Sequence, residues 1–334
     1  MCIRDRFAPV PGLFLTAALI AFLLDLPCRW LMGRGLSRIG SITLVMLLTV
    51  GLLVLAAVEL VPLLIAQLSQ LISASPALLA AAEAWINQGQ SWAINHGLPA
   101  DFADLSSDLI SQISRVATQF SQRLLGILGA TVGTTINVLI ILVLAVFLLL
   151  GADSIAAGLL EWLPLPWRGL VGSTLERTFR GYFAGQVVLA LILSAGQLVV
   201  FTVLEIPYGV LFAVLIGFTT LIPYASALTI VFVSAVLGVQ DPRTGIELLV
   251  AAIVVGQIVD QVIQPRLMGS IVGLQPAWLL IALPIGSRLG AILGVGDLLG
   301  LLLAVPMASC VKSLADAART GVKPPESPPV PAAP

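Results

Sequence analysis

The feature that most constrains this chain is a series of apolar runs, each about twenty residues or longer, that follow one another along the sequence. A helical run of that length crosses a hydrocarbon layer roughly 30 Å thick. Inside such a layer every backbone N–H and C=O must be hydrogen-bonded within the protein, which favours helices. A membrane β-barrel would instead alternate apolar and polar residues in segments of about ten. The runs therefore predict an all-α fold, a polytopic bundle of membrane-spanning helices.

Composition excludes several other classes of protein. Hydrophobic residues make up 59% of the 334 residues and charged residues 10%, whereas about a quarter of the residues in soluble domains are charged. The net charge is −1 and the basic residues are dispersed, so nucleic acid is not an expected partner. The sequence contains three cysteines without a CxxC pair and a single histidine, so no metal or other cofactor is expected. No catalytic constellation or phosphate-binding loop occurs in the sequence, so we do not expect an enzyme.

The runs predict about seven membrane helices, separated by short connections that hold most of the arginines. They cover residues 7–26, 39–65, 124–150, 181–204, 209–237, 246–263 and 276–311. The positive-inside rule predicts that the arginine-rich connections face the cytoplasm. Residues 181–204 and 209–237 should form a tight helical hairpin, because only a short turn separates them. The last run is too long for one simple crossing. We interpret it as one broken helix, with a pair of short re-entrant segments as the alternative.

This organisation divides the chain into four expected segments. They are N-terminal membrane helices (1–66), an amphipathic helical insert outside the lipid (67–123), a C-terminal transport bundle (124–311) and a disordered cytoplasmic tail (312–334). Within the insert, apolar residues repeat at helical spacing at Leu105, Leu109, Ile113, Val116 and Phe120. The first six residues differ in character from the run that starts at Phe7, which suggests a truncated start.

Polar residues gather at the end of the sixth run. An ionisable group within a membrane span costs roughly 2.5 to 3.5 kcal/mol, so each one needs an explanation. Spacings of three and four residues place Gln257, Asp260, Gln261 and Gln264 on one helical face. Arg266 follows within two turns and could neutralise Asp260. This face is either a polar stripe that lines a substrate or ion path, or the interfacial end of a helix with a snorkelling ion pair.

Two further places interrupt the runs. Arg288 and Asp297 lie among closely spaced glycines in the last run, where a broken helix can line a cavity and the glycines can serve packing. Pro223 and Tyr224 lie inside the fifth run. A proline there either kinks the helix or releases a carbonyl toward a permeant molecule.

Several short motifs in the C-terminal half carry a family resemblance. Residues 179–186 read Phe-Arg-Gly-Tyr-Phe-Ala-Gly-Gln and include Gly181, Gly185 and Gln186. Ile222-Pro-Tyr follows, then a segment with Pro265 and Gly269, then Pro276, a glycine-rich stretch and finally Ala304-Val-Pro306. In this order and spacing the chain resembles the autoinducer-2 exporter family of bacterial permeases. An intact member has about eight membrane helices, which implies that the first is missing before Phe7.

The resemblance implies a secondary transporter or facilitator, multi-pass in the bacterial cytoplasmic (inner) membrane. Family members are linked to export of a small signalling molecule and, in some cases, to exchange of sodium or lithium for protons. The leading hypothesis is export of a small polar solute similar to autoinducer-2, along a path formed by the face around Asp260 and the broken last run.

Two other functions stay open. A cation/proton antiporter would bind a proton and a cation alternately at Asp260 or Asp297. A non-transporting scaffold would use the insert to bind partners. The expected partners are the lipid bilayer and a small-molecule or ion substrate. The glycine-spaced helix faces suit either a homo-oligomer or internal packing.

Overall fold

The computed structural model describes residues 9–96, 115, 131–268 and 276–320, and every regular element in these ranges is a helix. This confirms the all-α class. The amphipathic repeat predicted at 105–120 lies almost entirely outside the described residues, as do the first six residues, Gly269 and the end of the tail.

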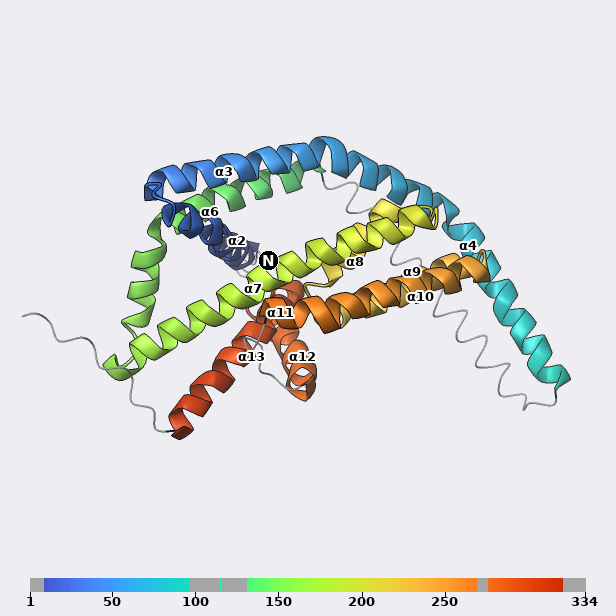
Figure 1. Ribbon diagram of the computed structural model, residues 1–334. Helices are drawn as coiled ribbons and strands as arrows, with labels where there is room; N and C mark the ends of the chain where they lie inside the picture. The colour runs from blue at the N-terminus through green and yellow to red at the C-terminus, as the bar shows by residue number, and fades with distance from the viewer. Residues whose placement is uncertain (1–8, 97–114, 116–130, 269–275, 321–334) are drawn as a thin grey trace, which may run out of the picture. The chain divides into compact units, whose positions relative to one another are not determined.

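The helices appear in Figure 1 in chain order. The α-helices are α2 (Pro9–Met32), α3 (Arg38–Leu55), α4 (Val61–Asn95), α6 (Thr131–Leu160), α7 (Leu165–Val203), α8 (Gly209–Thr219), α9 (Ala225–Gly238), α10 (Pro242–Ile258), α11 (Gln264–Met268), α12 (Pro276–Ile292) and α13 (Asp297–Thr320). In the described ranges two π-helical segments join neighbouring α-helices, η1 (Ala56–Leu60) and η2 (Val259–Ile263).

The described part of the chain contains 5 helices long and apolar enough to cross a membrane, or 6 if the bent α6 is counted as one span. Three shorter apolar helices accompany them, α8, α9 and most of α12. The sequence predicted about seven spans. The difference arises at the run 209–237, which divides into the short helices α8 and α9, and at the bent α6. The run 276–311 also divides into two helices, but one of them, α13, still counts as a span.

The chain forms two compact units. Unit 1 comprises residues 1–50, 136–188 and 264–334. Part of its core is an apolar cluster of buried residues from α2, α3 and α6, namely Ala21, Cys28, Ile42, Val45, Ala145 and Leu149. Two of these helices also meet through a weak hydrogen bond, in which the Cys28 thiol donates to the carbonyl of Ser41.

The last apolar stretch folds as a helical hairpin in unit 1. Gly294 and Gly296 have φ angles of 73° and 96° and reverse the chain between α12 and α13. The two helices then pack so closely that a methyl group on Gly290 would lie 2.8 Å from the Cα of Gly300. Small residues allow this contact between backbones. The single broken helix is therefore not what forms. The stretch is a helix of 17 residues packed against one long enough to span.

Unit 2 comprises residues 51–135 and 189–263. The predicted hairpin turn forms between α7 and α8, where Glu205 and Tyr208 have φ angles of 53° and 61°. The end of α7 packs on α8 through an edge-to-face contact of Phe201 with Phe212. Gln67 of α4 accepts a hydrogen bond from the backbone N–H of Leu211, one of the amides that the start of α8 leaves without a helical partner.

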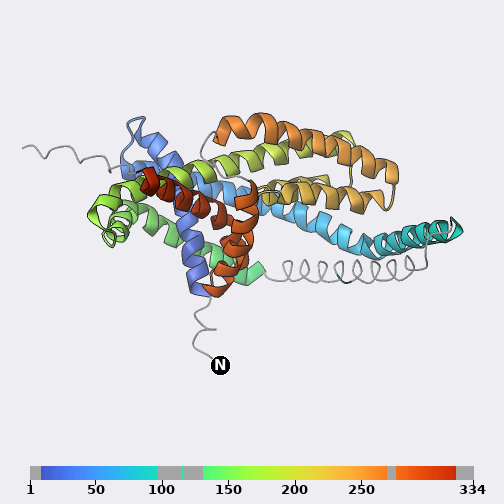
Figure 2. The same ribbon diagram turned by 90° about the horizontal axis from the view of Figure 1, so that it is seen from below.

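Helices α9 and α10 lie side by side in unit 2 (Figures 1 and 2). Gly238 and Gly245 bring their backbones together, since a methyl group on Gly245 would lie 2.9 Å from the carbonyl oxygen of Ser234. Asp241 caps α10, because its carboxylate accepts hydrogen bonds from the backbone N–H groups of Arg243 and Thr244. The Thr244 hydroxyl also donates to it, and this bond is the main reason that the pKa of Asp241 is lowered.

Replacing Gly300 with alanine should destabilise the α12–α13 hairpin. The added methyl group would overlap the backbone of α12, and overpacking of this kind costs about 1 to 3 kcal/mol. The measurement is the unfolding temperature of the purified protein in detergent, followed by tryptophan fluorescence. Gly158→Ala in α6 is the matched control, because a methyl group there meets nothing within 4 Å. Equal unfolding temperatures for the two variants would contradict the close approach of α12 and α13.

The start of α10 should lose protection at low pH. A carboxyl group with a lowered pKa stabilises the fold above its ordinary range and loses that contribution as the pH falls through its pKa in the folded state. The carboxylate accepts hydrogen bonds from the backbone N–H groups of Arg243 and Thr244. These two amides should therefore be less protected from exchange at about pH 2.5 than at about pH 5, when each exchange rate is compared with its intrinsic rate at that pH. Hydrogen exchange read by mass spectrometry measures this. Asp241→Asn keeps a capping oxygen but does not titrate, so the same pH response in that variant would refute the explanation.

Candidate functional site

The polar face predicted around Asp260 falls on a π-helical segment. Helix α10 continues into η2, which contains Asp260 and Gln261, and then into α11. Single π-helical turns inside long helices occur frequently at functional sites. The side chains of Gln257, Asp260 and Gln261 are exposed, whereas Gly256 and Val259 are buried. The polar face thus points away from the packed interior of unit 2.

The remaining members of this face belong to α11 and to unit 1. Gln264 is half-buried, and Pro265 and Arg266 are exposed. Because Asp260 belongs to unit 2 and Arg266 to unit 1, the neutralisation of Asp260 by Arg266 stays a prediction.

The fifth run is broken at the site predicted from Pro223 and Tyr224. Helix α8 ends at Thr219 and α9 begins at Ala225. Tyr224 precedes α9 with a φ of 68°, a left-handed conformation that is uncommon for a tyrosine. The hydroxyls of Thr219 and Thr220 donate to the carbonyl of Ile216, at 3.0 and 2.8 Å. The fifth run is therefore not one continuous helix with a kink at its proline. The run contains a break of several residues, and a role of its backbone carbonyls toward a permeant molecule stays a prediction.

Arg288 and Asp297 belong to the α12–α13 hairpin in unit 1, and both side chains are exposed. Gly286, Gly290 and Gly300 face the partner helix, so these glycines serve packing. Asp297 is the first residue of α13, where a carboxylate is favoured by the partial positive charge of a helix N-terminus. In the hairpin the small residues face inward between the two helices, whereas the two charged side chains face outward, although they are neighbours in the sequence.

Several of the motif residues are buried. Gly185 and Gln186 are buried in α7, Gly181 is half-buried, and the Gln186 amide donates to the Tyr182 hydroxyl at 3.3 Å. Pro306 is fully buried within α13, and Pro276 begins α12.

The sequence analysis missed Glu59. It lies in η1, the other π-helical segment, and it is an exposed carboxylate within the long apolar helix Arg38–Trp92. Among the acidic residues of unit 2, Glu59 and Asp260 each lie in a π-helical segment of an apolar helix. The criterion that selected Asp260, an ionisable residue inside an apolar run, could have found Glu59 as well.

An ion-pair network in unit 1 was also missed. Asp25 and Arg29 of α2 meet Glu176 and Arg180 of α7. Arg29 Nη1 lies 3.1 Å from Glu176, and Arg180 Nη2 lies 3.3 Å from Asp25. Two acids and two bases balance in charge, so the network joins the two helices without leaving a net charge among these four groups. Each helix carries its pair four residues apart, a spacing that the sequence does show.

Buried polar groups in unit 2 keep unused hydrogen-bonding capacity. Gln197 of α7 is fully buried and donates to the carbonyl of Ala252 in α10 at 3.0 Å. Its amide oxygen and the hydroxyl of buried Ser234 have no hydrogen-bond partner among the residues that the structure describes. A buried polar atom without a partner is costly.

Comparison with known proteins identifies the family. Residues 2–320 match the model of the AI-2E family transporter. The proposed Synechocystis transport protein sll0063 is 33% identical over 317 residues, which cover 92% of this chain and 77% of that protein. A second proposed Synechocystis transport protein, sll0060, is 29% identical over 93% of this chain and 89% of its own length. The proposed Bacillus subtilis transport protein YueF is 22% identical over 90% of this chain and 81% of its own length.

These matches confirm the resemblance seen in the motifs of the C-terminal half and extend it over nearly the whole sequence. Together with several helices long and apolar enough to cross a membrane, they place the chain in a known class. The chain belongs to the AI-2E transporter family, and it is a multi-pass membrane permease.

Proposed function

We propose that this permease exports a small polar solute, similar in chemistry to autoinducer-2, across the cytoplasmic membrane of a bacterium. The observation that carries the proposal is the exposed face of Gln257, Asp260 and Gln261, set in and beside a π-helical segment of an otherwise apolar span. A charge in a span costs roughly 2.5 to 3.5 kcal/mol. A chain that keeps Asp260 there needs a hydrated or solute-filled surface against that face.

The chemistry of the face suits a neutral, hydrogen-bonding solute. Two primary amides supply both donors and acceptors, and the carboxylate supplies strong acceptors. Hydroxyl and carbonyl groups on a small solute can pair with all three side chains.

Cation/proton antiport is the second candidate, and a separate observation favours it. Glu59 and Asp260 are two carboxylates in π-helical segments of unit 2. Carboxylates within membrane helices frequently mark proton and ion pathways. In this alternative one or both would release a proton when a cation binds. Asp297 in unit 1 is the third carboxylate to which the same role applies.

Substitutions at Asp260 distinguish the two functions. If the protein moves a neutral solute, Asp260→Asn keeps a hydrogen-bonding group and should retain at least about a third of the flux. Asp260→Leu removes the hydrogen bonds and should lower the flux about tenfold or more. The measurement is uptake of a panel of small polar solutes into vesicles that contain the purified protein, with and without a proton gradient.

The control is Asp241→Asn. The Asp241 carboxylate lies outside the spans and caps α10, the helix that continues into the segment with Asp260. This variant should leave the flux unchanged. Antiport predicts a different pattern, in which Asp260→Asn abolishes pH-coupled movement of sodium or lithium. If Asp260→Leu transports every solute as well as the unaltered protein does, the polar face is not the path.

A further inference from the structure

Helix α6 bends sharply near its end. Its parts Asn137–Ala152 and Ser154–Leu160 meet at an angle of 70°, and Figure 1 shows the change in direction before α7 begins. From Thr131, where α6 starts, to Ala152 the helix rises roughly 33 Å at about 1.5 Å per residue. This rise already crosses a hydrocarbon core about 30 Å thick. We call the part after the bend, Ser154–Leu160, the arm, and the crossing does not need it.

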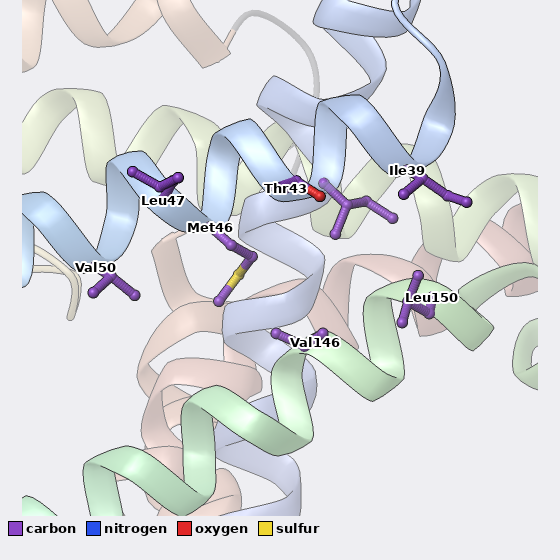
Figure 3. Close-up of a pocket in the computed structure, with 8 residues that line it drawn as sticks. Ile39, Thr43, Met46, Leu47, Val50, Val146 and Leu150 are labelled. Atoms are coloured by element: carbon purple, nitrogen blue, oxygen red, sulfur yellow. The ribbon is translucent and has the colours of Figure 1, made fainter.

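The bend lies at one surface of the membrane. Arg38, the first residue of α3, donates from Nη2 to the carbonyls of Leu149 and Leu150 at 3.3 Å each. Figure 3 shows Leu150 and Ile39 at the same end of an apolar groove of about 480 Å³ that both residues line. Helix α3 begins the long apolar helix Arg38–Trp92. The arm therefore starts about one helical turn beyond the level at which α3 enters the membrane.

The neighbouring connection between α2 and α3 has the composition of a membrane interface. Trp30, near the end of α2, is exposed, and the guanidinium carbon of Arg34 lies 3.5 Å from the centre of its ring. Tryptophans and basic residues are typical of the boundary between lipid and water. Spanning helices tilt by about 20° on average, so an arm that leaves one at 70° runs closer to the membrane plane than to its normal.

The arm turns its apolar side toward the lipid layer. A groove of about 200 Å³ lies in the corner beneath the bend, and we call it the corner groove. Ile155 and Leu159 of the arm line it, together with Leu148 of the spanning part and Phe22 of α2. Because residues of two spanning helices bound the same space, the two arm residues point back toward the apolar layer. Asp25 also lines the corner groove, and its carboxylate is bonded to two arginines of the ion-pair network.

The apolar side of the arm is largely exposed. Ile155, Leu159 and Trp162 follow one another at spacings of four and three, which places them on one face, and they are 43%, 69% and 92% exposed. The N–H of Glu161 bonds the carbonyl of Ala157 at 3.0 Å, so the helical path continues into the turn. Glu161 is also exposed and comes two residues after Leu159, on the opposite side of the arm. The arm is therefore amphipathic.

Contacts with α7 hold the arm in this orientation. In the turn between the two helices, Arg168 donates from Nε and Nη2 to the carbonyls of Leu163 and Glu161 at 2.9 and 2.7 Å. The end of the arm packs on α7, since a methyl group on Gly172 would lie 2.8 Å from Cδ1 of Leu160. These contacts fix the direction of the arm and leave its apolar face outside the packing with α7.

We infer that the arm and Trp162 form a membrane-surface anchor, whose partner is the lipid bilayer on the side of the α2–α3 connection. The arm lies along the boundary between headgroups and acyl chains, with Ile155, Leu159 and Trp162 among the lipids and acyl chains in the corner groove. Amphipathic helices of this kind bury their apolar face about 5–10 Å into that boundary. The exposed side chains of Phe147 and Leu150 continue the lipid-facing surface of α6 up to the bend.

Fluorescence quenching by brominated lipids tests the depth of Trp162. The purified full chain is placed in phosphatidylcholine vesicles with bromine at carbons 6 and 7, or at carbons 11 and 12, of one acyl chain. Subtracting the emission of Trp162→Phe from that of the native chain gives the emission of Trp162. Bromine at carbons 6 and 7 should reduce this emission about twofold or more, and bromine at the deeper carbons should reduce it less. Iodide on both sides of the membrane should quench it at most about a third as strongly as it quenches a water-soluble tryptophan derivative.

A matched pair of substitutions tests the orientation of the arm. In the Trp162→Phe background, Leu159→Trp and Ala157→Trp introduce the same side chain at two exposed positions on opposite sides of the arm. Bromine at carbons 6 and 7 should quench the first at least about twice as strongly as the second, and iodide should quench the second more strongly. Equal responses of the two variants to both quenchers would overturn the anchor.

Two results for Trp162 itself would also overturn the proposal. Strong quenching by iodide with none by bromine would place the arm in water. No quenching by either would mean that protein covers the exposed face, from a second copy or from elsewhere in the chain.

Discussion

The rest of this structure depends on one constraint, that backbone polar groups surrounded by lipid must find their hydrogen-bond partners within the protein. Helices meet this constraint locally, and the described spans are accordingly helical. Where the helical pattern stops inside an apolar run, side chains or turn conformations take over. The hydroxyls of Thr219 and Thr220 bond the end of α8, and the amide oxygen of Gln67 accepts from the start of that helix. Arg38 contributes in the same way to carbonyls of α6.

A second consequence of lipid as solvent concerns packing. Between helices in a bilayer the hydrophobic effect supplies little attraction, so close contact and interhelical hydrogen bonds take its place. The α12–α13 hairpin and the α9–α10 pair both use glycines at their closest approach. Gln197 adds a hydrogen bond from α7 to the backbone of α10. Small residues in this chain therefore have packing roles even where they lie next to charges, as they do around Arg288 and Asp297.

The polar side chains described above include two groups with different roles. One group is satisfied within the fold, such as the balanced network of Asp25, Arg29, Glu176 and Arg180. A second group, which includes Asp260 and Glu59, lies exposed on π-helical segments of apolar helices and supports the proposed transport function. The same rule, that a charge in lipid needs a partner, leads to a different partner in each case.

Hydropathy is a local property of the sequence. It was sufficient to predict the class of fold and most of the spans, and to identify Asp260, Arg288 and Asp297 as ionisable residues inside apolar runs. The motifs of the C-terminal half were likewise sufficient for the family. Glu59 meets the criterion that selected Asp260, an ionisable residue inside an apolar run, so the sequence contained the information needed to find it.

Contacts between residues distant in the sequence decided what hydropathy could not. An apolar run has the same composition whether it crosses once or folds back. The turn at Gly294 and Gly296 and the contact of Gly290 with Gly300 decided that the last run is a hairpin. The break at Tyr224 and the pairing of Asp25 with Arg180 are also products of packing. The sequence by itself determined which segments enter lipid, because each residue's transfer from water depends on its own side chain. Tertiary structure alone decided which faces meet, because that depends on pairs of residues that no local pattern connects.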